Sequence, residues 1–360
     1  MENNFNLIDE FFIHTKSRTY PVFLGKGAIG KLASFINDQL PKTTKIVVIT
    51  DENVVSHYSV LQQELQNFEV LLKVVPAGEK AKSFEIYYEC QTFALENKLD
   101  RNSIIIAFGG GAVGDLAGFV ASTFMRGIPF IQVPTTILAH DSAIGGKVAI
   151  NHELGKNLIG SFYQPHAVVY DLNFLATLSK KEKLSGFAEI IKEALIADES
   201  FFNWLLQNIT NIEEISTEQL QNILKQGMLI KQSIVAQDET EQNIRAYLNL
   251  GHTLGHAIEA NLGYGKWTHG QAVIVGTIFA IELSQKLYKL PFDLDVLKDW
   301  LIHLGYEIQL PKELVKEELI EKMFIDKKAS GNTLNYVLLE CIGKPILHKT
   351  TKEEITKLWS

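Results

Sequence analysis

Short apolar runs recur through the first half of the chain. Residues 45–50, 68–75 and 103–108 are rich in Val, Ile and Leu, and turn residues follow them. Such runs, without a polar face, are typical of strands buried on both sides of a parallel sheet. Between two of them, residues 83–99 show the apolar spacing of an amphipathic helix. We therefore predict alternating strand and helix units, with residues 167–171 as the last sheet-like run.

Longer helical patterns fill most of the second half, where only residues 334–341 look like a strand. The predicted helices cover residues 180–197, 199–209, 216–236, 249–262 and 268–288. We predict an α/β protein with two domains, divided near Thr177. Residues 1–177 would form a Rossmann-like, parallel-sheet nucleotide-binding domain, and residues 178–360 a mainly α-helical metal and substrate domain.

Composition narrows the class of function. The chain has 360 residues, of which 46% are hydrophobic and 21% charged, as in ordinary globular enzymes. A formal charge of −8 disfavours nucleic acid and anionic membranes as partners, and no apolar run approaches the ~18 residues of a membrane span. Cys90 and Cys341 lie far apart without metal-ligand spacing, so we expect free thiols and a cytoplasmic location.

A glycine run follows the third predicted strand and precedes a helical stretch. Gly109, Gly110 and Gly111 lack side chains, so backbone N–H groups there can approach a pyrophosphate, and a helix N-terminus adds partial positive charge. The run is not GxGxxG, and a tight turn without a ligand is the alternative reading. Asp51, after an earlier strand, and the polar turn at residues 79–82 add candidate contacts to a nucleotide.

Histidines and one carboxylate form a second candidate group. His252 and His256 are four residues apart and would share one helix face, and His269 starts the next helical pattern. Glu189 lies on an otherwise apolar helix, where burial without a cation is costly. Thr253 after His252 excludes the HExxH signature of zinc peptidases. Two histidines and one carboxylate suit a catalytic divalent ion, preferably zinc, and a purely structural histidine pair is the alternative.

A third group is cationic. Most lysines of an acidic protein are simply solvated, but several here adjoin glycine turns or the helices of the predicted metal site, which favours a pocket for phosphate or carboxylate. The group comprises Lys147, Lys156, Lys192, Lys231, Arg245, Lys327 and Lys328.

These motifs occur in an order that resembles one enzyme family. The segments are GGGAVGDLAGF at 109–119, RGIP at 126–129, QVPTT at 132–136, DSAIGGK at 141–147, GKN at 155–157, FYQP at 162–165 and NLGHTLGHAIE at 249–259. Together they resemble 3-dehydroquinate synthase, a sugar phosphate cyclase of the shikimate pathway, over residues 20–345.

The resemblance implies that 3-deoxy-D-arabino-heptulosonate 7-phosphate becomes 3-dehydroquinate and phosphate. The implied steps are transient oxidation at C5 by NAD, phosphate elimination, re-reduction, ring opening and aldol closure. The resemblance also implies a homodimer.

The resemblance assigns roles residue by residue. Zinc or cobalt would be held by Glu189, His252 and His269. NAD would be bound by Asp51, Glu79, Lys80, Lys82, Gly110, Gly111, Gly114, Asp115, Thr135, Thr136, Lys147, Lys156 and Thr177. Substrate would be bound by Asp141, Lys147, Asn157, Lys192, Lys231, Arg245, Asn249, His256 and one or both of Lys327 and Lys328.

Two alternatives stay open. A metal-dependent polyol or alcohol dehydrogenase of the same fold would also need NAD and a histidine-rich metal site, but it would release NADH and would not need the phosphate-binding lysines. A nucleotide-binding scaffold without activity would need neither the metal ligands nor the cationic pocket.

Overall fold

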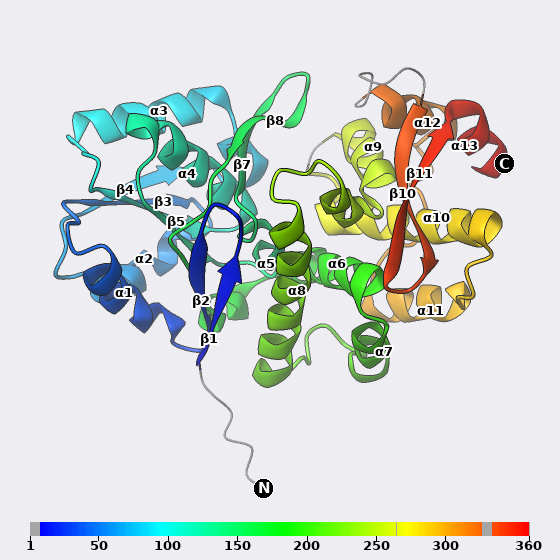
Figure 1. Cartoon of the computed structure of the whole chain (residues 1–360), viewed down its shortest axis with the longest axis horizontal. Helices are drawn as coiled ribbons and strands as arrows, with labels where there is room; N and C mark the ends of the chain where they lie inside the picture. The colour runs from blue at the N-terminus through cyan, green and yellow to red at the C-terminus, as the bar shows by residue number, and fades with distance from the viewer. Residues whose placement is uncertain (1–7, 264, 326–332, 360) are drawn as a thin grey trace, which may run out of the picture. The chain divides into compact units, whose positions relative to one another are not determined.

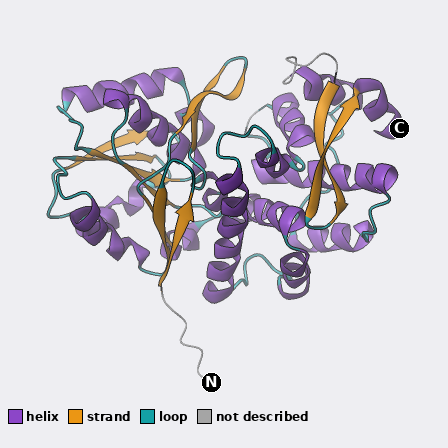
Figure 2. Ribbon diagram, viewed as in Figure 1, coloured by secondary structure: helices purple, strands orange, loops and turns teal. Residues whose placement is uncertain are grey.

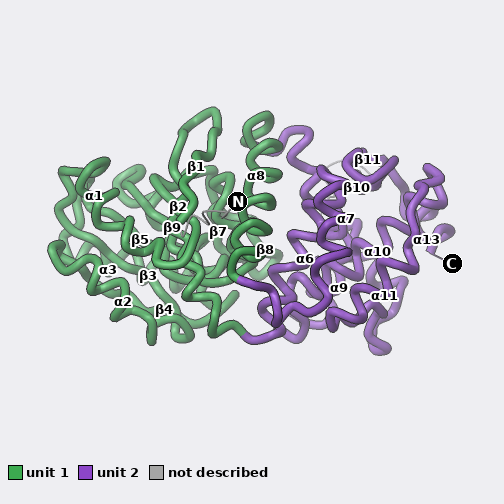
Figure 3. The backbone as a smooth tube through the Cα atoms, turned by 90° about the horizontal axis from the view of Figure 1, so that it is seen from below, with its two compact units in different colours: residues 1–178, 217–239 green, residues 179–216, 240–360 purple. Residues whose placement is uncertain are grey.

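The computed structural model describes residues 8–263, 265–325 and 333–359. The chain forms two compact units (Figure 3): unit 1 is residues 1–178 and 217–239, and unit 2 is residues 179–216 and 240–360. Unit 2 starts close to the boundary predicted at Thr177. However, α8 (Thr217–Gln237), predicted to lie in the domain of residues 178–360, belongs to unit 1. It does so because it packs against β1, β2 and α5. The functions assigned to the two domains stay predictions.

Unit 1 is built on a seven-stranded sheet in the order β1, β2, β9, β6, β5, β3, β4. Figure 1 labels five of these strands, β1, β2, β3, β4 and β5. All neighbours are parallel except β1 and β2. The strands are β1 (Ile8–His14), β2 (Thr19–Gly25), β3 (Ile46–Asp51), β4 (Val70–Val75), β5 (Ile104–Gly109), β6 (Phe130–Pro134) and β9 (Ala167–Asp171).

Helices cover both faces of this sheet (Figure 2). Alternate strand residues face opposite ways: Ile46 packs in the cluster with α1 and α2, and Val47 in the cluster with α3 and α4. Every residue of β3 and β5 is buried, which explains why their sequences show no polar alternation. The helices are α1 (Leu32–Gln39), α2 (Tyr58–Glu64), α3 (Phe84–Glu96), α4 (Gly111–Thr123) and the short α5 (Ala139–Ser142).

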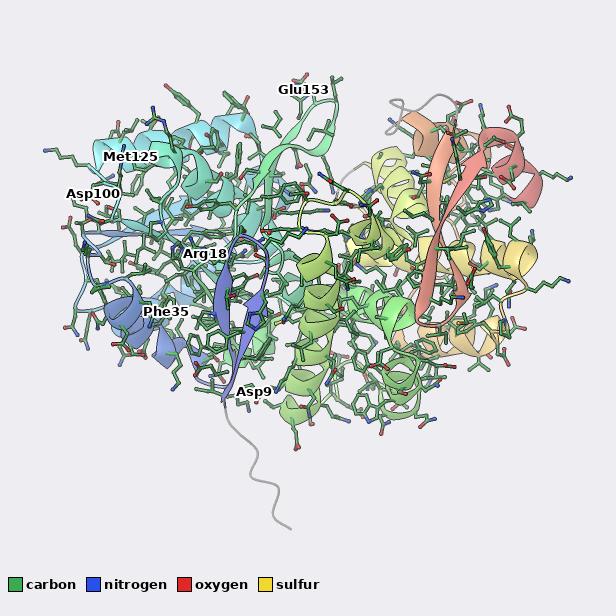
Figure 4. All side chains as sticks on the ribbon, viewed as in Figure 1. Asp9, Arg18, Phe35, Asp100, Met125 and Glu153 are labelled. Atoms are coloured by element: carbon green, nitrogen blue, oxygen red, sulfur yellow. The ribbon has the colours of Figure 1, made fainter. Side chains whose placement is uncertain are left out.

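Two antiparallel hairpins in unit 1 have no counterpart among the predicted elements. One is β1 with β2, and the other is β7 (Lys147–His152) with β8 (Gly155–Phe162), which has Glu153 at its turn (Figure 4). Most residues of β8 are exposed or half-buried, so the strand lacks the apolar run that marks the central strands.

Unit 2 is mainly helical, as predicted. Its helices are α6 (Lys180–Ala197), α7 (Glu199–Asn208), α9 (His252–Leu262), α10 (His269–Tyr288), α11 (Leu294–Leu304), α12 (Lys316–Ile325) and α13 (Lys352–Trp359), with a hairpin of β10 (Thr333–Cys341) and β11 (Lys344–Thr351). The helix predicted from residue 249 begins at His252, because residues 244–249 form a 3-10 helix and Gly251 adopts a φ of 78°. No helix in the described ranges has the length and apolarity needed to cross a membrane.

Candidate functional site

The glycine run lies at the carboxyl edge of the sheet. β5 ends at Gly109, Gly110 caps α4 without any side-chain hydrogen bond, and the first N–H groups of the helix are left for another acceptor. The neighbouring loop is tied to this turn, since Thr135 donates its N–H to the carbonyl of Gly109 at 3.0 Å. The predicted nucleotide contacts at 110–111 and 135–136 therefore share one sheet edge.

The glycines of this turn are closely packed, and a buried hydroxyl lies beside them. A Cβ on Gly110 would lie 3.0 Å from Cγ2 of Thr136, and one on Gly114 would lie 2.6 Å from Oε1 of Gln132. Gly114 is thus required for close packing of α4 on the sheet, and its predicted cofactor contact stays a prediction. The buried Oγ1 of Thr135 has no hydrogen-bond partner among the described residues, which points to a polar ligand at this edge.

A polar network joins the turn after β4 to α4 and the β7–β8 hairpin. The buried Nζ of Lys82 donates to Asp115 at 2.6 Å and to the side-chain oxygen of Asn157. Asn151 donates to Glu79 at 2.7 Å and accepts from the N–H of Asn157 at 3.0 Å. Burial by itself would lower the pKa of Lys82. The negative charges of Asp115 and Glu79 outweigh burial, so the net pKa is raised and the ammonium stays charged. The structure thereby joins residues predicted for cofactor and for substrate.

The remaining predicted nucleotide contacts also belong to unit 1. Asp51 ends β3, and its Oδ1 accepts the N–H groups of Asn53 and Val54 at 2.9 and 3.0 Å. Burial raises the pKa of Asp51. Thr177 contacts Nε2 of His57 at 3.4 Å, Lys80 is exposed and Lys156 is half-buried.

Two of the predicted substrate groups in unit 1 form an ion pair. Nζ of Lys231, on α8, lies 2.9 Å from Oδ2 of Asp141, on α5, and also donates to the backbone carbonyl of Asp141. Lys231 is 6% exposed, so this ammonium is held by an acid rather than by water. Lys147 starts β7 and is exposed.

In unit 2, the predicted carboxylate ligand is almost fully buried. Glu189 is 1% exposed, and its Oε2 pairs with the ammonium of Lys192 one turn along α6. Burial by itself would raise the pKa of Glu189, but Lys192, His252 and His269 hold it well below its usual range. Oε1 has no hydrogen-bond partner within the described residues, so this oxygen is available as a ligand.

Two imidazoles converge on that oxygen. Nε2 of His252 lies 3.5 Å and Nε2 of His269 lies 3.4 Å from Oε1 of Glu189. Nδ1 of His252 is 3.1 Å from the carbonyl of Leu250, and Nδ1 of His269 is 3.1 Å from Oε2 of Glu259. Each Nδ1 therefore has an acceptor, so in the neutral form of either ring the lone pair lies on Nε2, the nitrogen nearer Glu189.

The electrostatics of the two rings differ. Burial lowers the pKa of His252 to about 3, so this imidazole is neutral. Burial also acts to lower the pKa of His269, but the neighbouring carboxylates of Glu189 and Glu259 outweigh burial and raise the pKa to about 10. A cation is favoured next to His269, and in the metal-free protein a proton on the ring supplies that charge.

The donor set fits a divalent metal. Ligands placed about 2.0–2.2 Å from a tetrahedral zinc ion are separated by roughly 3.3–3.6 Å, and the oxygen-to-nitrogen distances here fall in that range. An alternative set replaces Glu189 by the exposed His256, because ligand nitrogens of His252, His256 and His269 all lie within 4.8 Å of one another. The buried oxygen of Glu189 favours the set predicted from sequence.

Two further predicted substrate groups also belong to unit 2. Arg245 is 1% exposed, and the side-chain amide of Asn249 donates to Glu241 at 3.0 Å. Lys327 and Lys328 lie outside the described residues.

Three residues that touch these groups have no role predicted from the sequence: Glu259, Glu241 and Asn151. Glu259 had a detectable signal, since it follows His252 by seven residues and so lies on the same face of α9. Asn151 had none, because its contacts depend on the hairpin register.

Family models and curated relatives that match this chain carry the name of one enzyme family. A family model described as 3-dehydroquinate synthase N-terminal matches residues 72–185, and one described as 3-dehydroquinate synthase C-terminal matches residues 186–329. The chain is 51% identical over 333 residues to a 3-dehydroquinate synthase of Bacillus cereus, covering 92% of each chain. It is 48% identical over 348 residues to that of Listeria monocytogenes, covering 96% of this chain and 95% of the relative.

Solved structures share the fold. A 2-deoxy-scyllo-inosose synthase complexed with carbaglucose-6-phosphate, NAD+ and Co2+ matches with a TM-score of 0.89 and 26% identity, covering 97% of this chain and 99% of that one. An iron-containing alcohol dehydrogenase matches with a TM-score of 0.68 and 18% identity, covering 98% of each chain, which shows the fold alone.

Proposed function

Because the chain belongs to the 3-dehydroquinate synthase family, it is an enzyme of that type, and we propose that the side chains described above carry out its reaction. The enzyme acts in the shikimate pathway, where 3-deoxy-D-arabino-heptulosonate 7-phosphate is converted to 3-dehydroquinate and phosphate. The observation that carries the residue assignment is the convergence of His252 and His269 on the buried Oε1 of Glu189.

Glu189, His252 and His269 would hold a divalent metal, zinc or cobalt. When bound, such an ion polarises the oxygens of the substrate as a Lewis acid. Lys192 keeps Glu189 ionised, so the carboxylate stays a ligand without taking up a proton. His256, exposed beside the other two rings, is placed to exchange protons with a bound substrate and with water.

The turn at Gly110 and Gly111, the loop at Thr135 and Thr136, and the Lys82 network would hold NAD. When bound, NAD supplies a hydride acceptor that returns to its starting state in each turnover. The N-terminus of α4 would bind the pyrophosphate through its first N–H groups. Asp51, with one oxygen engaged by its own turn, would accept from a ribose hydroxyl through the other.

The cationic groups would bind the phosphate and carboxylate of the substrate. Lys231 is oriented by its ion pair with Asp141, and Asn157 is fixed by Lys82. The other residues assigned to this role are Lys147, Lys192, Arg245 and Asn249, with Lys327 and Lys328 outside the described residues. Holding the phosphate in one orientation favours its departure, because less freedom is lost in reaching the transition state.

The dehydrogenase alternative is distinguished by its products. The enzyme is incubated with the heptulosonate phosphate and a catalytic amount of NAD, while released phosphate and absorbance at the NADH band are followed together. We expect one phosphate per substrate without NADH accumulation. Stoichiometric NADH from simple polyols, with no phosphate released, would overturn the proposal in favour of the dehydrogenase.

Two broader features belong to the same proposal. A cytoplasmic location fits two free cysteines, of which Cys90 is buried with its thiol pKa raised to about 12. A homodimer follows from the family resemblance, and light scattering coupled to size exclusion measures it directly.

A further inference from the structure

Glu259 is a buried carboxylate that contacts one of the proposed metal ligands. It lies on α9 with 5% of its surface exposed, and its Oε2 is 3.1 Å from Nδ1 of His269. A buried carboxylate is costly unless hydrogen bonds or a charge compensate it. The hydrogen bond from Nδ1 of His269 is one such compensation for Glu259.

The contact determines which nitrogen of His269 faces the metal site. An ionised carboxylate only accepts hydrogen bonds, so Nδ1 must donate and the lone pair of the neutral ring is left on Nε2. Nε2 is the atom that lies 3.4 Å from Oε1 of Glu189. His252 is oriented in the same way, but by the carbonyl of Leu250.

His269 has a particular need for a negatively charged partner. It is the first residue of α10, where the helix dipole places partial positive charge and so disfavours a cation. Its side chain is 27% exposed against 13% for His252, so packing restrains the ring less. A carboxylate on Nδ1 offsets the helix charge and makes Nε2 a stronger donor to a metal.

We propose that Glu259 is a positioning residue that holds His269 in the tautomer and orientation needed to bind a divalent metal. The inference rests on the proposed function only in taking His269 as a ligand. Unlike the proposed ligands, Glu259 is not expected to touch metal or substrate.

The test measures metal binding directly. Full-length Glu259→Ala and Glu259→Gln are stripped of metal and titrated with Co2+ against a chromophoric chelator, and the visible Co2+ absorption spectrum is recorded. Roughly 10- to 100-fold weaker binding is expected for Glu259→Ala, the usual effect of losing such a partner. The amide oxygen of Glu259→Gln can still accept from Nδ1, so this variant should bind with intermediate affinity and a wild-type spectrum.

A matched control separates positioning from the general loss of a buried acid. Glu239, 7% exposed, accepts from the side-chain amide of Gln164 at 2.8 Å and from the N–H of Ser17 at 3.0 Å, all within unit 1. Glu239→Gln should bind Co2+ as the wild type does.

The outcomes distinguish the two levels of the proposal. Wild-type affinity and spectrum in both Glu259 variants would overturn the role of Glu259 while leaving the ligand assignment intact. A wild-type protein that binds no Co2+ would overturn the proposed ligands and this inference together. If Glu259→Ala does not fold, weakened binding by folded Glu259→Gln supports the proposal, and unchanged affinity and spectrum in that variant overturn it.

Discussion

Each proposed metal ligand is held by a different kind of partner. Glu189 is held by the ammonium of Lys192, His252 by a backbone carbonyl and His269 by a carboxylate. Each of the three side chains comes from a different helix and is oriented by its own hydrogen-bond or ion-pair partner. The ligands should therefore be individually necessary for metal binding.

Substitution of the histidines tests this at the level of single residues. His252→Ala and His269→Ala should each lose stoichiometric metal, because each removes one of only three protein ligands, and activity should fall with metal content. Metal per chain is measured by elemental analysis after dialysis. His256→Ala is the control and should retain one metal per chain. Full occupancy in both ligand variants, or metal loss only in His256→Ala, would contradict the ligand set.

His166 carries a pH dependence of stability. Burial, with Arg18 of the β1–β2 turn adding to it (Figure 4), lowers its pKa from 6.5 to about 4. Between these values the unfolded chain takes up a proton that the folded chain does not, so stability is lost as pH falls from about 6.5 through 4.

His166→Gln should remove that contribution. Its free energy of unfolding should vary less with pH across this window than that of the wild type, by about 1–3 kcal/mol in total, given ~1.4 kcal/mol per pKa unit. Urea unfolding at several pH values between 7.5 and 4 measures the difference. Parallel curves for the two proteins would show that His166 is not the responsible group.

At the scale of elements, the junction of β5 and α4 explains the glycine run. The helix has to start within one residue of the strand end, and a Cβ on Gly110 would press on Thr136 at 3.0 Å. The run therefore permits close packing and leaves the first N–H groups of α4 without a covering side chain.

Gly110→Val should weaken NAD binding by at least tenfold, because the added side chain displaces Thr136 and covers the helix N-terminus. Isothermal titration calorimetry measures the affinity. Cys90→Ala, a substitution in the buried face of α3, is the control and should bind NAD normally. Wild-type NAD affinity in Gly110→Val would show that the nucleotide does not bind at this turn.

At the scale of the whole molecule, the reaction needs a redox cofactor, a metal and residues that bind the phosphate and carboxylate groups of the substrate. The residues proposed to bind the redox cofactor lie in unit 1 and the proposed metal ligands lie in unit 2, while the proposed phosphate-binding cations occur in both units. An oxidoreductase of the same fold needs only the first two, so the cationic residues are what should distinguish the synthase.

Arg245 tests that distinction. Its side chain is fully buried, and truncation to Ala should cost about 2–3 kcal/mol of transition-state binding, or roughly 30- to 150-fold in kcat/KM, as for a charge-assisted contact left unpaired. NAD affinity should stay nearly unchanged. Arg245→Lys keeps the charge and should lose less. Equal kcat/KM for wild type and Arg245→Ala would show that this guanidinium does not bind the substrate.

Local sequence was sufficient for some buried elements but not for all. β6 was not predicted, although its five residues are all buried, because the strand is short and contains Gln132 and Pro134. α6 has the predicted limits of 180 and 197, and β5 differs from its prediction by one residue at each end, because a strand or helix buried in the core carries an apolar pattern of its own period. β1, β8 and β11 were missed because strands with exposed or half-buried faces and mixed polarity do not show such a pattern.

By itself, the sequence determined the fold class, the family and the kinds of side chain available for chemistry, since these depend on periodicity and on ordered motifs. Only the tertiary structure decided which groups meet. Glu189 and His269 are 80 residues apart, yet they meet because α10 packs against α6. The contact of Glu259 with His269 joins one helix to the start of the next, and it depends on the loop between α9 and α10, a geometry that no helical period encodes.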